Sequence, residues 1–96
     1  MSINLIIDDD EPEQIASTTG WGDVCEWAVG LELGDFRNLV SFVEHGVSES
    51  VGKVREELVK ALADSPPDES HVRSTLDGLL DVLDSAKDAG HMIVSS

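Results

Sequence analysis

Residues 47–86 read VSESVGKVREELVKALADSPPDESHVRSTLDGLLDVLDSA, and this stretch decides the fold that the sequence predicts. Its first half repeats apolar residues at helical spacing. These residues are Val51, Val54, Leu58, Ala61 and Leu62. At 3.6 residues per turn they share one face, so the pattern predicts an amphipathic helix over about residues 49–63.

A proline corner interrupts this helix, and a second apolar stripe follows it. Proline lacks the backbone N–H and disfavours the α conformation in the residue before it, so Pro66 and Pro67 end the first helix. Ser65 and Asp68 have capping-box spacing, which predicts a new helix over about 66–88. Its stripe comprises Val72, Leu76, Leu79, Leu80, Leu83 and Ala86. Two facing stripes joined by a short connection predict an antiparallel αα-hairpin.

Two further helices are expected before this hairpin. Trp21, Val24, Cys25 and Ala28 fall on one stripe and predict a helix near 20–29. A second helix is expected over 35–45, with Asp35 as its cap and a glycine just past its end. The sequence therefore predicts a mainly α fold: a small four-helix domain, built on the αα-hairpin, that spans 1–96 as a single domain.

Short apolar segments flank the predicted helices at both termini. Ile3–Ile7 is β-branched and apolar, and residues 91–94 (His-Met-Ile-Val) are apolar again, so both are expected to be extended. Two alternatives stay open for them: they pair with each other, or they add to a sheet in a second copy and form a homodimer. Residues 8–19 are expected to be a solvated acidic connecting segment, with at most one helical turn.

The chain is strongly acidic, with a formal net charge of −14. Residues 1–50 contain eleven acidic residues and one arginine, and residues 51–96 contain nine acidic and five basic residues. Such a chain repels nucleic acid phosphates and anionic membranes, so neither is an expected partner. Three causes of the acidity stay open: solubility, a basic partner, or adaptation to high salt.

The sequence also gives an expectation for the cellular compartment. No stretch approaches the ~20 consecutive apolar residues that a membrane-spanning helix needs. No basic region precedes an apolar stretch near the N-terminus, as it would in a secretory signal. The single cysteine, Cys25, excludes an intrachain disulfide framework and fits a reducing compartment. A cytoplasmic location is therefore expected.

No motif in the sequence indicates catalysis. The run Asp8-Asp9-Asp10 offers oxygen ligands for a hard cation, but Glu13 stands where a calcium loop beginning at Asp8 requires glycine. The histidines at 45, 71 and 91 lie in separate elements without zinc-like spacing. Cys25 has acidic neighbours, which disfavour its thiolate. The sequence therefore predicts no catalytic, cofactor-binding or metal-binding residue, no cofactor and no enzyme.

Two features indicate binding to another protein. Trp21 is expected in the core, whereas Trp27 lies on a different helix face and is available either to cover neighbouring leucines or to anchor a partner. Burial of both tryptophans is at least as good an alternative. Four aspartates form a stripe on the solvent side of the last predicted helix: Asp77, Asp81, Asp84 and Asp88. Their rise of about 5 Å per step resembles the charge spacing of a nucleic acid strand. A plain solvated helix face explains the stripe better than mimicry does.

These observations predict a small acidic helical protein-interaction module without catalytic activity. Its expected partner is another protein with a basic surface. One alternative is an inhibitor or immunity-type protein whose acidic surface mimics nucleic acid against a basic partner. A less favoured alternative is a small metal-dependent enzyme that uses Asp8–Asp10.

Overall fold

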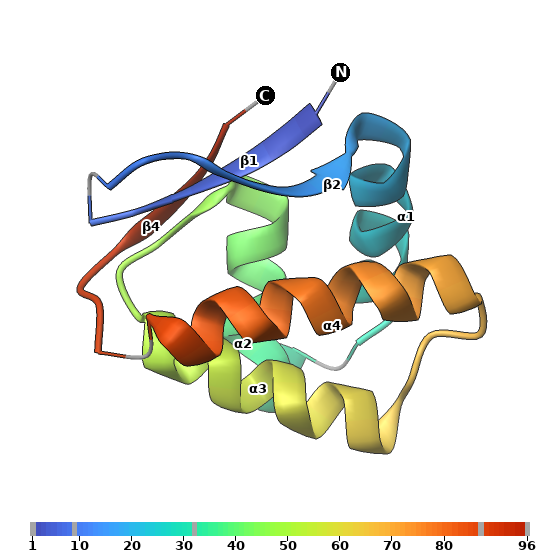
Figure 1. Cartoon of the computed structure of the whole chain (residues 1–96). Coiled ribbons are helices and arrows are strands. Elements are labelled where there is room, and N and C mark those ends of the chain that lie inside the picture. The colour runs from blue at the N-terminus through green and yellow to red at the C-terminus, as the bar shows by residue number, and fades with distance from the viewer. Residues whose placement is uncertain (1, 9, 32, 87, 96) are drawn as a thin grey trace.

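The computed structural model describes residues 2–8, 10–31, 33–86 and 88–95. The elements in chain order are β1 (Ser2–Ile7), β2 (Glu13–Ser17), α1 (Thr18–Val29), α2 (Leu33–His45), β3 (Val47–Ser48), α3 (Val51–Asp64), α4 (Ser70–Ser85) and β4 (Met92–Ser95). The described strands form one antiparallel sheet in the order β2-β1-β4-β3, and the helices lie on one side of it (Figure 1).

The predicted mainly α four-helix domain is wrong, because the fold is α+β. The two terminal segments pair with each other as the central strands of a sheet, with Ile6 opposite Ile93. The sequence prediction missed both edge strands. β2 lies at an edge and is mostly exposed, so it lacks an apolar signature, and β3 has only two residues. An isolated two-stranded ribbon is marginal in water, and these two edges together with the helix layer make the pairing stable.

The β1–β2 hairpin also corrects the expectation for residues 8–19. Glu13–Ser17 forms a strand, while the acidic connection is confined to the turn before it. Leu5 is paired with Glu13. Directly opposed residues point to the same face of a sheet, so the Glu13 side chain faces the helix layer together with the buried Leu5.

The αα-hairpin core is confirmed. α3 and α4 run antiparallel (Figure 1), and the predicted apolar stripes face inward. The fully buried members of the stripes are Val51, Val54, Leu58, Ala61, Leu76, Leu79 and Leu83. Leu80 and Ala86 are only partly buried.

The corner between α3 and α4 differs from the prediction. α4 begins at Ser70 rather than near 66, so Ser65 and Asp68 do not form its capping box. The Ser65 N–H instead donates to the Ala61 carbonyl at 2.8 Å, and Ser65 is the C-cap of α3. The connection therefore spans residues 65–69, and α4 ends at Ser85, before the predicted position 88.

α2 has a kink that a side chain from α3 caps. Phe36 departs from helical geometry with φ −127° and ψ 27°, so the N–H groups just after it lack helical acceptors. Oε1 of Glu57 accepts from the backbone N–H of Asn38 at 2.9 Å and of Leu39 at 3.2 Å, and Oε2 accepts from Asn38 Nδ2 at 2.6 Å. Glu57 thus serves as an N-cap supplied by another helix.

The end of α2 agrees with the prediction. The helix ends at His45, and Gly46 follows with φ 75°, a left-handed conformation that glycine adopts without a steric penalty. None of the described helices is both long enough and apolar enough to cross a membrane.

Candidate binding pocket

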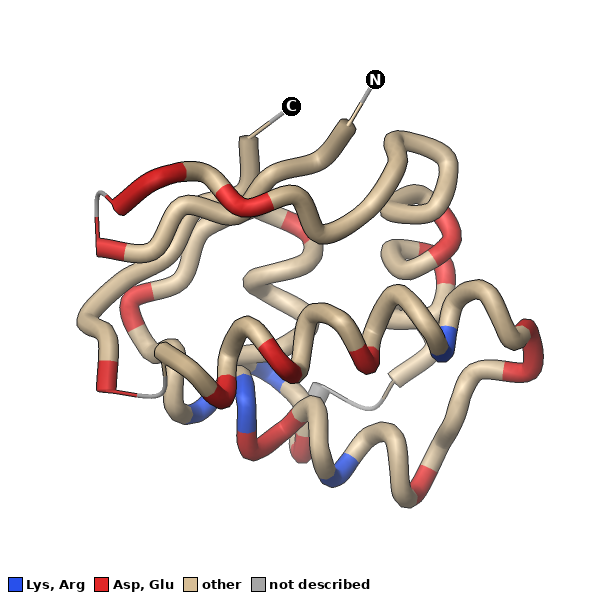
Figure 2. The backbone as a smooth tube through the Cα atoms, viewed as in Figure 1, with Lys and Arg blue, Asp and Glu red and all other residues tan. Residues whose placement is uncertain are grey.

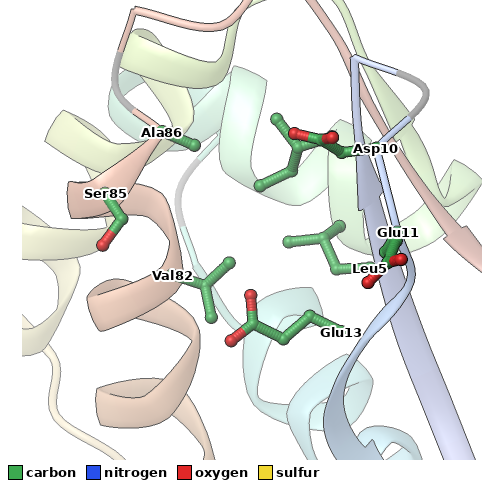
Figure 3. Close-up of a pocket in the computed structure, with 8 residues that line it drawn as sticks. Leu5, Asp10, Glu11, Glu13, Val82, Ser85 and Ala86 are labelled. Atoms are coloured by element: carbon green, nitrogen blue, oxygen red, sulfur yellow. The ribbon is translucent and has the colours of Figure 1, made fainter.

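A cavity with convergent polar groups lies between the β1–β2 hairpin and the last turn of α4. It has a volume of about 510 Å³. Its lining residues are Leu5, Ile7, Asp10, Glu11, Glu13, Val82, Ser85 and Ala86. Figure 3 shows the acidic side chains on the hairpin side and Val82 with Ala86 on the α4 side. We call this cavity the acid-walled pocket.

Strand alternation and helix periodicity together build the pocket. Leu5 and Ile7 are two residues apart in β1 and therefore share the inner face of the sheet. Val82 follows the buried Leu79 by three residues, which places it at the margin of the core stripe. Glu13 reaches toward Val82 in Figure 3. The floor of the pocket is therefore apolar, and its wall is acidic.

The electrostatics of the pocket are negative. Residues 1–36 contain no lysine or arginine. Among the described residues, no ion pair involves Asp10, Glu11 or Glu13. Figure 2 shows the described lysines and arginines on the helices, away from the hairpin. The three carboxylates are thus a negative wall that draws cationic groups toward the apolar floor.

Asp8 holds the hairpin turn in place. Its φ is 49°, in the left-handed region that aspartate tolerates better than most residues. Its carboxylate accepts from the backbone N–H of Gly90 at 3.1 Å and of His91 at 2.9 Å. Asp8 therefore joins the hairpin to the segment before β4, and Asp10 lines the pocket. Asp9 lies outside the described residues, so the predicted cation-binding run is not described as a unit.

The predicted aspartate stripe is not continuous. Asp88 lies beyond the end of α4. Asp84 forms an ion pair with Arg55 of α3, and Asp77 pairs with Arg73 at 3.1 Å. Asp81 is exposed. Arginines of the same chain thus offset much of the charge on which the mimicry hypothesis depends.

Trp27 packs against the core and forms a hydrogen bond within the chain. Its ring is partly buried against the core, and its Nε1–H donates to the Ser65 carbonyl at 2.9 Å. The ring therefore ties α1 to the corner between α3 and α4. Trp21 enters the core as predicted and meets Phe42 edge-to-face, with the ring centroids 6.3 Å apart.

Cys25 and the three histidines each have a different environment. Burial raises the pKa of the Cys25 thiol, which disfavours the reactive thiolate. His71 lies beside Asp23, with its Nε2 at 2.7 Å from Asp23 Oδ2. The hydrogen bond to Asp23 raises the pKa of His71, and the charges of Glu69 and Asp23 add to this effect. His91 lies near Asp8 at 3.8 Å, and His45 is exposed at the end of α2.

Sequence reasoning missed the residues that form the acid-walled pocket. The sequence places Asp10, Glu11 and Glu13 in a predicted solvated connection, and it gives no prediction for Val82. The available signal was local: an apolar alternating strand, a turn, and then a second segment able to pair with it. Nothing local indicated that the hairpin would lie against the end of α4.

Comparisons of the chain with protein-family models, curated proteins and solved structures found no match.

Proposed function

We propose that this protein is a small acidic protein-interaction module that binds a basic segment of a partner protein in the acid-walled pocket. The observation that supports this proposal is the combination of three acidic side chains with an apolar floor in one cavity. A simple solvated surface would scatter its carboxylates over polar neighbours. Here Asp10, Glu11 and Glu13 line the same cavity as Leu5 and Val82.

The pocket matches the two parts of a lysine or arginine side chain. Such side chains bury their methylene stem along apolar surface while the charged group stays with polar partners. The stem would lie against Leu5, Val82 and Ala86, and the cationic group would face the carboxylates. Arginine would add bidentate hydrogen bonds to a carboxylate, so it should bind more tightly than lysine.

The charge of the whole protein adds a longer-range contribution. A net charge of −14 attracts a basic segment and accelerates its encounter with the protein. Exposed charges are screened beyond about 10 Å at 0.1 M salt, so binding should weaken as salt is added. The same charge opposes the approach of a second copy. Because β1 and β4 already pair within the chain, a dimer formed by strand addition would use β2 or β3.

The test compares two variants of equal charge. In the first, Asp10→Asn, Glu11→Gln and Glu13→Gln neutralise the wall. In the control, Glu44→Gln, Glu56→Gln and Asp64→Asn neutralise three exposed acidic residues elsewhere. A fluorescent peptide that alternates arginine with leucine serves as the probe, and fluorescence anisotropy gives its Kd.

The wall variant should bind the peptide about tenfold more weakly than the wild type, or about 1.4 kcal/mol, as expected for three partly exposed ion pairs. The control variant should lose no more than about twofold, through the general field alone. A citrulline version of the peptide should not bind. Equal losses in the two variants would show that binding depends on net charge and would refute the proposal.

A further inference from the structure

A second group of polar side chains lies at the other end of α4, away from the acid-walled pocket. It contains Asp23 from α1, Glu69 just before α4 and His71 in its first turn. The Nε2 atom of His71 is 2.7 Å from Asp23 Oδ2 and 3.3 Å from Glu69 Oε2. All three ligand atoms lie within 4.8 Å of one another. One imidazole nitrogen and two carboxylate oxygens are therefore close enough together to reach a single ion.

Glu69 shows that this convergence is more than helix capping. It occupies the N-cap position of α4, where an acidic side chain commonly accepts a backbone N–H of the first turn. The structure shows no such bond from its side chain. The Glu69 carboxylate turns toward His71 instead.

The surroundings favour a cation. An adjoining cavity of about 230 Å³ shares Asp23 and Glu69 with the group and is lined in addition by Glu26, Asp68 and Trp27. No lysine or arginine is among its described lining residues. The two extra carboxylates add negative charge, and the cavity has room for water ligands. A cation there would be attracted by four acidic side chains.

The two separations that involve His71 are close to those around a tetrahedral ion. Zn–N and Zn–O bonds of about 2.0–2.1 Å place neighbouring ligand atoms about 3.3 Å apart. The Glu69–His71 separation already has this value, and the Asp23–His71 separation needs to widen by only ~0.6 Å. Mixed nitrogen and oxygen ligands select zinc and its neighbours in the first transition row, whereas Mg²⁺ and Ca²⁺ prefer oxygen alone.

We infer that Asp23, Glu69 and His71 form a binding site for one zinc-like divalent ion, with water completing its coordination. The ligands come from α1 and from the start of α4, which are far apart in the sequence. A bound ion would therefore fasten α1 to the beginning of α4, next to the corner that Trp27 already contacts through Ser65. An ion that binds only the folded chain stabilises it.

Calorimetric titration of Zn²⁺ into chelator-treated protein tests the inference. His71→Ala removes the nitrogen ligand, and Asp23→Asn weakens an oxygen ligand without a change of shape. His91→Ala is the matched control, because His91 is also a carboxylate-paired histidine but has only one carboxylate partner. The Co²⁺ absorption spectrum of the wild type reports the coordination geometry.

The wild type should bind one Zn²⁺ per chain and show a tetrahedral Co²⁺ spectrum. His71→Ala and Asp23→Asn should each weaken binding at least tenfold, since even outer-shell changes commonly cost that much. His91→Ala should change the affinity by less than twofold. Circular dichroism in the absence of metal confirms that each variant is folded, which is expected because His71 is exposed.

Several outcomes would overturn the inference. Zinc binding that is weak, multiple and equal in all variants would show only counter-ions gathered by the net charge. A preference for Mg²⁺ or Ca²⁺ over Zn²⁺ would exclude histidine as a ligand. Neither result bears on peptide binding in the acid-walled pocket, because these substitutions lie outside its lining residues.

Discussion

The acid-walled pocket and the helix layer of α2, α3 and α4 are both rich in carboxylates, but they use them differently. In the helix layer, Glu57 caps the kink of α2, Asp84 pairs with Arg55 and Asp77 pairs with Arg73. In the pocket, Asp10, Glu11 and Glu13 have no ion-pair partner within the part of the chain that the structure describes. The density of acidic residues in a sequence therefore does not show which carboxylates can meet a partner.

The largest expected effect is a loss of stability when a carboxylate with a structural role is removed, compared with one in the pocket. Glu57→Ala leaves the backbone N–H groups of Asn38 and Leu39 without their acceptor in a partly buried site. We expect this change to lower the free energy of unfolding by about 2–3 kcal/mol. Glu13→Gln, in the pocket, should change it by no more than about 0.5 kcal/mol. Urea unfolding monitored by circular dichroism measures both values.

If the two variants unfold at the same urea concentration, the distinction between the two regions fails. Glu57→Gln refines the result, because it keeps one oxygen acceptor but loses the charge. We expect the free energy of unfolding of Glu57→Gln to lie between those of the wild type and Glu57→Ala, since hydrogen bonds to a charged acceptor are stronger than those to a neutral one.

A smaller effect is expected when the arginines of the helix layer are removed. Arg55→Ala together with Arg73→Ala releases Asp84 and Asp77 from their ion pairs. Each of these pairs is at least partly exposed, so the loss of stability should stay below about 1 kcal/mol per pair. The exposed face of α4 should then bind the basic peptide as a second, weaker site.

Backbone amide shifts in NMR spectra would locate that second site. We expect the peptide to shift pocket amides in the wild type, and both pocket amides and those around Asp77 and Asp84 in the double variant. If the shifts stay confined to the pocket, its apolar floor rather than the availability of carboxylates selects the peptide. That result would favour Leu5 and Val82 as the main determinants of binding.

The smallest expected effect is a change in the pKa of His71, whose partner Asp23 lies in α1, outside both the pocket and the helix layer. In metal-free buffer, the pKa of His71 should lie above the ordinary value of about 6.5. Asp23→Asn should lower the pKa of His71, because it removes the hydrogen bond that is the main cause of the increase. NMR titration of the imidazole protons measures it, and Asp84→Asn, at the far end of α4, is the control.

The direction of the pH dependence follows from this higher pKa. A histidine that binds its proton more tightly in the folded protein stabilises it at low pH, and this contribution disappears as the pH rises through the folded-state pKa. The difference in stability between the wild type and Asp23→Asn should therefore be largest in acid and shrink above that pKa. A difference that grows with rising pH would contradict the observed contact between His71 and Asp23.

The sequence by itself determined the helical core. Leu58, Leu76 and Leu83 repeat at helical spacing, and a repeat of that kind buries one face whatever it packs against, so their burial could be predicted. The helix end at Gly46 was also predictable, because glycine alone takes the left-handed conformation there without cost.

Only the tertiary structure decided the sheet, the acid-walled pocket and the cluster around His71. β2 is an exposed edge strand that owes its conformation to hydrogen bonds with β1 rather than to its own residues. Asp23 and Glu69 meet at His71, and Glu13 lines one cavity with Val82, only because distant segments pack together. Local periodicity reports which face of an element is buried, but contacts between elements depend on free energies that are summed over the whole chain.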